Sequence, residues 1–391
     1  MTETAHSNRP PFGREARAEF QLDPDVVHLN HGSYGAVPKR VADAQRAMLK
    51  QIEADPSQFM AMESRPRLRE IAGQIGSYIG ADADGIALVE NATNAVNVVL
   101  RSLSFSDGDE IVVTNQTYGA VLNTVTHICS LTGAIRKDIE LPYPAHNPDD
   151  VVAAYRDAIG EKTRLVVVDH ITSPTALLLP IEPIIRLAHE AGALVLVDGA
   201  HAPGMIPLNV AALAPDFYTG NCHKWLCAPR GCAFLWCAEP HRANMHPLVI
   251  SHGFGGGFEA EFDWVGTRDA SAQFALSEAF AFRERYGDAE TMAHNHQLVL
   301  KAAAMLAERW GTEVGAPAEM TGSMATIRLP LSGPADTQAA LAIRARLHAE
   351  HKIQVPVNAL AGAFWVRISA QIYNEMADYE RLAEAGEMLA P

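Results

Sequence analysis

The stretch "ALVLVDGAHAPG", residues 193–204, decides the fold. Its first five residues are apolar without interruption, which is typical of a strand buried on both faces of a sheet. Strands of this kind belong to parallel sheets covered by helices on both sides. The apolar run ends at Asp198, and small residues and a histidine follow it. Because ligands of open parallel sheets bind beyond the carboxyl ends of the strands, we predict an α/β fold with a site beside Asp198.

Similar apolar runs recur along the first two thirds of the chain, with helix-like segments between them. The strand candidates are residues 85–91, 109–115, 164–170, 193–200, 215–221 and 232–239. The helix candidates between them include residues 93–103, 119–133 and 181–192. This alternation predicts a mostly parallel sheet between two layers of helices. Polar and small residues follow the strands, in "NATN", "QTYG", "ITSPT", "HAPG" and "CHKW", so they are expected to gather at one edge of the sheet.

The last third of the chain has a different pattern. Residues 271–311 form one long helical stretch, and after it come strand candidates at 324–330 and 363–369 and helix candidates at 337–351 and 376–389. This order predicts a smaller α+β domain. We therefore expect an N-terminal arm (1–20), a large domain (21–265), and an interdomain helix with a small C-terminal domain (266–391). The N-terminal segment is expected to pack with the small domain.

Composition narrows the classes of function. The chain of 391 residues has 48% hydrophobic and 20% charged residues, which is globular composition. A net charge of −15 argues against nucleic acid or an anionic membrane surface as a partner. The start lacks the apolar segment of a signal peptide, and no apolar run is long enough to span a bilayer. With an odd number of cysteines, five, these features predict a cytoplasmic protein without a disulfide framework.

Four of the cysteines are regularly spaced, five residues apart. They are Cys222, Cys227, Cys232 and Cys237. The spacing does not match the short C-x-x-C pattern of zinc or iron–sulfur sites. We interpret them as buried structural thiols and expect no metal.

Lys224 stands in "TGNCHKWLCAPRG", residues 219–231, a stretch that is otherwise almost free of charge. An amine in an apolar pocket has a lowered pKa and becomes a nucleophile towards carbonyl groups. Asp198, 26 residues earlier, ends an apolar strand and is expected to be a desolvated carboxylate that needs a cationic or hydrogen-bonding partner. A lysine that forms an imine and an aspartate that keeps a ring nitrogen protonated are the two parts that a pyridoxal phosphate site requires.

The phosphate of such a cofactor needs its own binding site. In "ENATNAVNVVL", residues 90–100, a strand ends and a helix begins, and a helix N-terminus attracts anions. Ala92 and Thr93 lie at that start, and Asn221 and His223 beside the lysine are further donors. Taken alone, the "NATN" stretch is also compatible with an ordinary helix start.

Taken together, these motifs resemble the fold-type I pyridoxal phosphate enzymes, in particular the class V aminotransferase group that includes cysteine desulfurases. "VLVDGAHAPG" resembles the aspartate motif of that family, "GNCHKW" its lysine motif and "ENATNAVNVV" its phosphate loop. "DWVGTRD" resembles the segment that sends a threonine, here Thr267, into the phosphate site of the partner subunit, and "FWVRISAQIYN" resembles the segment with the substrate-binding arginine, here Arg367. The resemblance implies a seven-stranded sheet, pyridoxal 5'-phosphate as cofactor and a homodimer.

Within that group, "HLNHGSYGAVP", "TYGAVLNT" and "DHITSPTALLLPI" look most similar to the isopenicillin N epimerase-like branch, which is also similar to C–S lyases of cysteine conjugates in secondary and sulfur metabolism, including antibiotic biosynthesis. The resemblance implies that Lys224 carries the cofactor and is the base at Cα, and that Asp198 pairs with the pyridinium nitrogen. Tyr118 would lie over the ring, although a core tyrosine is the alternative. His201 would position Asp198 or contact the ring, and a purely structural histidine is the alternative.

Further roles follow from the same resemblance. Arg367 would bind the substrate carboxylate in a bidentate pair, unless a structural Asp or Glu is its partner. Asn30 and His31 would contact the substrate. Asp169 and His170 would flank the ring oxygen.

The expected reaction begins with removal of the Cα proton of an amino-acid substrate bound as an external aldimine. Residues 351–367, "HKIQVPVNALAGAFWVR", contain no cysteine, so we do not expect a persulfide-forming cysteine desulfurase. We predict β-elimination from an S-substituted cysteine. The alternatives are an epimerase, which needs a second proton donor such as Tyr118 or a water, a class V aminotransferase or decarboxylating oxidative deaminase, and a non-catalytic binding protein on the same fold.

Overall fold

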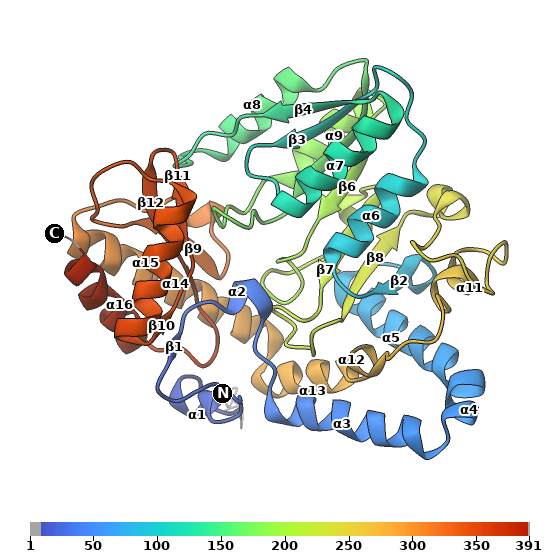
Figure 1. Cartoon of the computed structure of the whole chain (residues 1–391), viewed down its shortest axis with the longest axis horizontal. Helices are drawn as coiled ribbons and strands as arrows, with labels where there is room; N and C mark the ends of the chain where they lie inside the picture. Colours follow the sequence, from blue (N-terminus) through green and yellow to red (C-terminus); the bar gives the residue numbers. More distant parts are fainter. Residues whose placement is uncertain (1–8, 390–391) are drawn as a thin grey trace, which may run out of the picture.

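The computed structural model describes residues 9–389, so the first eight residues of the predicted N-terminal arm lie outside the described residues. The chain forms a seven-stranded sheet between helices and, beside it, a smaller C-terminal domain, which is drawn in orange and red in Figure 1. This architecture confirms the predicted fold class. No helix in residues 9–389 is long and apolar enough to cross a membrane.

The large sheet has the strand order β2-β8-β7-β6-β5-β3-β4. Its strands are β2 (Ile86–Val89), β3 (Glu110–Thr114), β4 (Ile135–Ile139), β5 (Thr163–Asp169), β6 (Leu194–Asp198), β7 (Phe217–Asn221) and β8 (Ala233–Cys237). Strands β7, β6, β5, β3 and β4 are parallel, whereas β8 is antiparallel to both β7 and β2. The sheet is therefore mostly parallel, as the apolar runs predicted.

Strand β4 has no counterpart among the strand candidates from the sequence. It lies at the edge of the sheet, and Arg136, Lys137 and Asp138 occupy its middle. An edge strand has one side in contact with water, so its sequence does not carry the apolar run of a buried strand. These charged residues keep the edge strand from pairing with another chain, and because of them the search for apolar runs did not predict β4.

Alternate residues of the central strands enter two separate apolar cores. Leu165 and Val167 of β5 pack on one face of the sheet, and Val166 and Val168 pack on the other. The first face is covered by α6 (Ala92–Ser102) and α7 (Gly119–Thr132). The opposite face is covered by α5 (Ser64–Ile79), α8 (Pro148–Ala158) and α9 (Ile181–Glu190). Burial on both faces explains why these strands are continuously apolar.

The smaller domain is built on a three-stranded antiparallel sheet in the order β11-β12-β9. Its strands are β9 (Met324–Arg328), β11 (Val357–Leu360) and β12 (Ala363–Ser369), and its helices include α14 (Asp288–Trp310), α15 (Thr337–His351) and α16 (Met376–Leu389). Near the N-terminus, β1 (Val27–His28) pairs in parallel with β10 (Ile353–Gln354), so an early segment joins this domain. Among the remaining helices are α1 (Arg14–Arg17), α2 (His31–Tyr34), α3 (Lys39–Ala54), α4 (Pro56–Gln58), α10 (Val210–Leu213) and α11 (Phe258–Phe262).

The single long helix predicted for residues 271–311 is wrong in its continuity. The stretch forms α12 (Ser271–Phe274), α13 (Leu276–Tyr286) and α14 in succession. The break between α13 and α14 is at Gly287, whose φ is +82°. Glycine adopts this left-handed conformation without steric strain, so the chain turns there although the apolar pattern continues.

Candidate active site

A cleft of about 650 Å³ lies beyond the carboxyl ends of β5, β6 and β7. Most of the residues predicted for the site line it: Ala92, Thr93, Tyr118, Asp169, Asp198, His201, Asn221, His223, Lys224 and Arg367. Four do not line it: Asn30, His31, His170 and Thr267. The strand ends form one end of the cleft, which we call the cofactor end. The other end, which we call the mouth, is formed by α2, the loop after β5 and segments of the smaller domain.

Lys224 follows β7 and lies half-buried in the cleft wall. Desolvation inside the cleft lowers the pKa of Lys224 to about 7, with Asp198 raising it and Arg367 lowering it further. Near neutral pH a substantial fraction of the amine is therefore unprotonated. An unprotonated amine is the form that attacks an aldehyde and accepts a proton from carbon.

His201 is the nearest polar partner of that amine. Its Nε2 lies 3.1 Å from Nζ of Lys224, and Nε1–H of Trp225 donates to its Nδ1 at 3.4 Å. Because an indole nitrogen only donates, the hydrogen-bond pattern assigns the imidazole proton to Nε2. Burial holds the pKa of His201 well below its usual range, so the ring is neutral. Its Nε2–H then donates to the free amine of Lys224.

Two carboxyl groups lie side by side at the strand ends. Asp169 of β5 and Asp198 of β6 are paired in register, and both side chains are buried. Burial raises the pKa of Asp169 well above its usual range, and the nearby Asp198 raises it further. Oδ2 of Asp169 has no hydrogen-bond partner among residues 9–389. Burial also raises the pKa of Asp198, whose Oδ1 accepts the N–H of Ala200 at 3.0 Å. A cation is the partner that would stabilise Asp198 in its charged form.

The start of α6 forms the floor of the cofactor end. The Asn91 side chain caps the helix by accepting the N–H of Asn94 at 2.9 Å, and the N–H of Ala92 donates to Oδ1 of Asn221 at 2.9 Å. Nδ1 of His223 lies 3.1 Å from the carbonyl oxygen of Cys232, which fixes its proton there and leaves Nε2 for the cleft. The Thr93 backbone N–H has no partner within the helix, as is general at a helix N-terminus.

Arg367 reaches the mouth from β12 and is almost wholly buried. Its guanidinium donates to the backbone carbonyl of Ser173 and to Oγ of Ser33 at 3.0 Å, while its Nε has no partner. No carboxylate of residues 9–389 forms an ion pair with it. Burial and the nearby Arg344 lower the pKa of Arg367 to about 10. The alternative partner considered from the sequence, a structural Asp or Glu, is absent among residues 9–389, which leaves the group available to an anion in the cleft.

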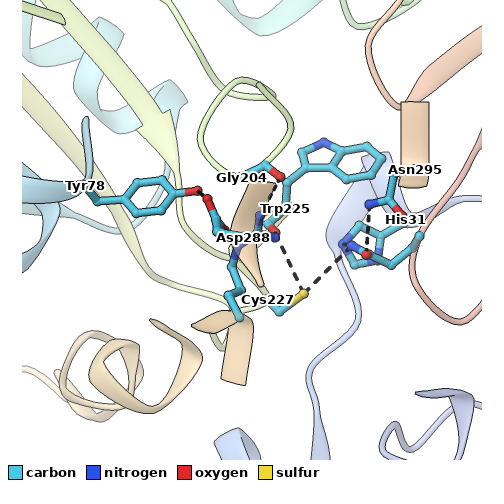
Figure 2. A network of polar contacts seen from close by, with 9 residues as sticks. His31, Tyr78, Gly204, Trp225, Cys227, Asp288 and Asn295 are labelled. Carbon is cyan, nitrogen blue, oxygen red and sulfur yellow. Dashed lines mark hydrogen bonds and ion pairs between the residues drawn. The ribbon is translucent and has the colours of Figure 1, made fainter. Parts of the chain in front are cut away.

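A buried polar network, shown in Figure 2, contacts the backbone of the loop that carries Lys224 on the side away from the cleft. The guanidinium of Arg283 donates to the carbonyl oxygens of Trp225 at 2.7 Å and of Gly204 at 3.0 Å, and it is paired with Asp288. Nε2 of His31 lies 3.0 Å from the carbonyl oxygen of Lys224 itself. These contacts fix the backbone at Lys224 and at the residue after it, so the lysine side chain starts from a defined position.

His31 and Asn30 therefore lie behind the cleft wall. His31 is fully buried between Tyr373, whose hydroxyl is 3.0 Å from Nδ1, and the backbone of Lys224. Asn30 accepts a hydrogen bond from Ser33 at 2.6 Å and lies 3.4 Å from Arg367. Their substrate contacts stay a prediction, and in the structure both side chains contact residues that line the cleft. Both side chains position the site from outside it.

Three other predicted residues have distinct places. His170 is buried, with Nδ1 2.8 Å from the hydroxyl of Tyr218, and it does not face the cleft. Tyr118 begins α7 at the edge of the cleft and is 46% exposed. Thr267 is exposed on a loop outside the cleft, and its predicted role in a partner subunit stays a prediction.

Several residues of the site had no assigned role in the sequence. Ser33, Tyr34, Ser173, Arg344 and Asn358 line the mouth. Ser173 stands in "ITSPT" directly after a strand, so its position was a usable signal. Arg344 lies within the helix α15, where an arginine carries no particular signal.

The residues at the cofactor end fit pyridoxal 5'-phosphate. The helix start offers N–H groups to a phosphate, and Asp198, which is buried without a cation other than Lys224 nearby, suits a pyridinium nitrogen. The partly neutral Lys224 suits the aldehyde.

Comparisons with known proteins agree with this fit. The family model for class-V aminotransferases matches residues 33–382. An L-cysteine desulfhydrase of Arabidopsis thaliana is 32% identical over 396 residues, which cover 92% of this chain and 87% of that protein. The isopenicillin N epimerase of Amycolatopsis lactamdurans is 32% identical over 390 residues, 95% of this chain and 96% of that protein.

Solved structures share the fold. The cysteine desulfurase CsdA of Escherichia coli superposes with a TM-score of 0.80 at 22% identity, over 95% of this chain and 97% of that one. The cystine C–S lyase C-DES in complex with its product cysteine persulfide superposes with a TM-score of 0.79 at 21% identity, over 94% and 99%. The family match and the cleft lead to one conclusion: the chain belongs to the class-V aminotransferase family, and its cofactor is pyridoxal 5'-phosphate.

Proposed function

We propose that this chain catalyses β-elimination from an S-substituted L-cysteine. The observation that carries the proposal is the content of the cleft. It holds one amine, Lys224, with a pKa of about 7, and among residues 9–389 no cysteine lines it. An elimination needs a single base at Cα, whereas a persulfide-forming reaction needs a thiol that reaches the substrate sulfur.

In the proposed reaction, residues of the chain bind the substrate and accept its proton. Arg367 holds the substrate carboxylate, and Lys224 takes the Cα proton. When bound, pyridoxal phosphate supplies an electron sink for the pair left at Cα. That pair forms the Cα=Cβ bond as the Cβ–S bond breaks, and the sulfur leaves with the bonding electrons. Water then hydrolyses the released 2-aminoacrylate to pyruvate and ammonium, with no net oxidation or reduction.

Two further observations support elimination over persulfide formation. The cysteines Cys222, Cys227, Cys232 and Cys237 are buried, and burial raises the pKa of Cys227 and Cys237 to about 12. Such thiols are poor nucleophiles. Relatives named L-cysteine desulfhydrase also support a reaction at cysteine sulfur.

Epimerisation is the second candidate. The half-exposed Tyr118 at the edge of the cleft is a possible second proton donor, and relatives named isopenicillin N epimerase cover almost the whole chain. An epimerase returns the proton to the opposite face of Cα and breaks no bond at Cβ.

Proton NMR in heavy water separates the two reactions. The cofactor-loaded protein is incubated with S-substituted L-cysteines, their sulfoxides and plain L-amino acids. Pyruvate with a released thiol or sulfenate is the result expected. Deuterium at Cα with inversion and an intact side chain would replace the proposal by epimerisation. A K50A variant, altered at an exposed lysine, is the control for the K224A variant in this assay.

A separate assay addresses persulfide formation. L-cysteine is added, and the protein is tested for bound persulfide by cyanolysis. Cys129, on α7, is the one cysteine of the five that is partly exposed, so C129A is the relevant variant. We expect both the wild type and C129A to release free sulfide and to carry no protein-bound persulfide. A persulfide that requires a cysteine of this chain would overturn the proposed reaction.

We further propose that the functional unit is a homodimer in which Thr267 completes the phosphate site of the partner. Thr267 is exposed and lies outside the cleft of its own chain, close in sequence to an exposed apolar segment, residues 248–250, and to Phe254. Exposed apolar segments of this kind mark interaction surfaces.

Mixing two inactive variants tests this arrangement. In a mixed dimer of K224A and T267A, one of the two sites has an intact Lys224 and an intact Thr267 only if the threonine comes from the partner. We expect mixing to restore cofactor affinity and activity to one of the two sites of each mixed dimer, which is about a quarter of all sites after random exchange of equal amounts. No restoration, or a light-scattering mass of a single chain, would contradict the proposal.

A further inference from the structure

The mouth of the cleft contains a second arginine whose role the proposed reaction does not use. Arg344 extends from α15 of the smaller domain and lines the cleft with Arg367. It is half-buried, unlike most of its neighbours on that helix. Its charge acts on Arg367, because it helps to lower the pKa of that group to about 10.

Arg344 also differs from nearby arginines in having no anionic partner. Arg346, two residues later, pairs with Glu350 at 3.0 Å, and Arg328 on β9 pairs with Glu313 at 3.3 Å. Within residues 9–389 the guanidinium of Arg344 forms neither an ion pair nor a hydrogen bond. Arg367, which is nearly fully buried, has no carboxylate either.

The carboxyl groups in the cleft do not balance these two charges. Asp198 lies at the cofactor end, where it serves the pyridinium nitrogen, and Asp169, whose pKa is raised by burial, lies beside it at the end of β5. Two guanidinium groups thus face one cleft without a protein anion between them. Like charges that share a poorly solvated space repel each other, so the arrangement favours an occupant with two negative groups.

We infer that Arg344 binds a second anionic group, at the far end of the substrate side chain, while Arg367 binds the α-carboxylate. The inference rests on the proposed elimination and narrows its substrate to S-substituted cysteines whose sulfur substituent ends in a carboxylate or similar anion. The cleft volume of about 650 Å³ is in the range that accommodates a cofactor with an extended ligand. Tyr34 and Asn358 line the same mouth and give the substituent an aromatic and an amide contact.

A matched pair of substrates tests the inference. S-carboxymethyl-L-cysteine and S-carbamoylmethyl-L-cysteine have nearly the same shape and differ by one negative charge. We expect the wild-type protein to prefer the acid over the amide by roughly tenfold in kcat/KM, the size of one charge-assisted contact at a partly exposed site. In R344M the ratio of acid to amide should fall close to one, while R346M, on the same helix but outside the cleft, should keep the wild-type ratio.

A binding measurement separates this inference from the proposed reaction. L-2-aminoadipate and its 6-amide carry a methylene in place of the sulfur, so they bind but have no leaving group. Their affinities for the cofactor-loaded proteins are measured by calorimetry. Tighter binding of the acid, lost in R344M and kept in R346M, supports the second anion site even if no pyruvate forms from any cysteine conjugate. Equal binding of acid and amide to the wild type would overturn the second anion site, even if elimination proceeds.

Discussion

The two ends of the cleft are built in different ways. The cofactor end consists of residues at the ends of β5, β6 and β7 and the start of α6, all from one sheet and its covering helix. The mouth combines α2 from near the N-terminus, the loop after β5, α15 and β12. These segments are far apart in the sequence and meet only in the folded chain (Figure 1). Arg367, for example, contacts Ser33, which lies 334 positions earlier.

The polar groups of the two ends differ as well. At the cofactor end the groups hold one another: His201 faces Lys224, Asn221 binds the start of α6, and Arg283 fixes the lysine loop from behind. At the mouth, Arg367 and Arg344 have no anionic partner in the described part of the chain, residues 9–389. A cofactor that stays bound favours a preorganised site, whereas a substrate that comes and goes supplies the missing charges itself.

The largest effect is expected from removal of Lys224. In the proposed mechanism Lys224 is both the attachment point of the cofactor and the base, so we expect the kcat of K224A to fall by at least about 10⁴-fold, the upper range for a general base. Treatment with sodium borohydride should add the mass of the reduced cofactor to the wild type and to K50A but not to K224A. An adduct of equal size in K224A would mean that another residue carries the cofactor.

The two neighbouring aspartates should respond very differently to amide replacement. Burial and the nearby Asp198 raise the pKa of Asp169 well above its usual range, which favours its neutral form, so D169N should change kcat by less than about fivefold. In the proposed site Asp198 carries a charge beside the pyridinium nitrogen, so D198N should lower kcat by about 10²–10³-fold. Steady-state kinetics measures kcat for both variants, and the absorbance of the cofactor shows that each variant has bound it. Equal losses in the two variants would show that both carboxyl groups act as anions.

The cofactor end could be predicted from the sequence because its residues follow buried strands directly. A strand buried on both faces leaves a continuous apolar run, and the polar residue after it stands out, as Asp198 and Lys224 do. The edge strand β4 gave no such run, since its middle residues Arg136, Lys137 and Asp138 face water.

The mouth could be predicted only where a family motif reached it. Arg367 has such a motif, whereas Arg344 looks like any arginine on a helix. The expected substrate contacts of Asn30 and His31 stay a prediction, whereas their contacts with Arg367 and the Lys224 backbone came only from the folded chain. These contacts join segments about 190 or more residues apart, and no local pattern records them.

Replacement of Arg367 tests whether the mouth is built for an anion and not for stability. In R367M we expect KM to rise about 10- to 100-fold, the equivalent of 1.5–3 kcal/mol for hydrogen bonds to a charged group, with a smaller change in kcat. Because the buried guanidinium has no carboxylate partner, the same variant should keep or raise the Tm of the substrate-free protein. The control is R328M, which alters an exposed arginine of the adjacent strand. A strongly lowered Tm would assign Arg367 a structural role.

The smallest expected effect is on the pH dependence of cofactor binding to Lys224, which lies where the two ends of the cleft meet. Its pKa of about 7 predicts that the rate of cofactor binding to the cofactor-free protein rises about tenfold per pH unit below pH 7 and levels off above it, because only the neutral amine reacts. Asp198 raises this pKa and Arg367 lowers it, so the midpoint should shift to lower pH in D198N and to higher pH in R367M.

Stopped-flow absorbance from pH 5.5 to 9 measures these midpoints, and titration of the free cofactor is common to all the proteins compared. R328M should have the wild-type midpoint, since its exposed charge is paired with Glu313. Shifts in opposite directions would show that the mouth and the cofactor end act on one amine with opposite sign. Once an anionic substrate neutralises Arg367, the pKa of Lys224 should rise, which strengthens the lysine as a base at the moment when it must accept the Cα proton. A midpoint that moves in neither variant would mean that desolvation alone sets the pKa of the lysine.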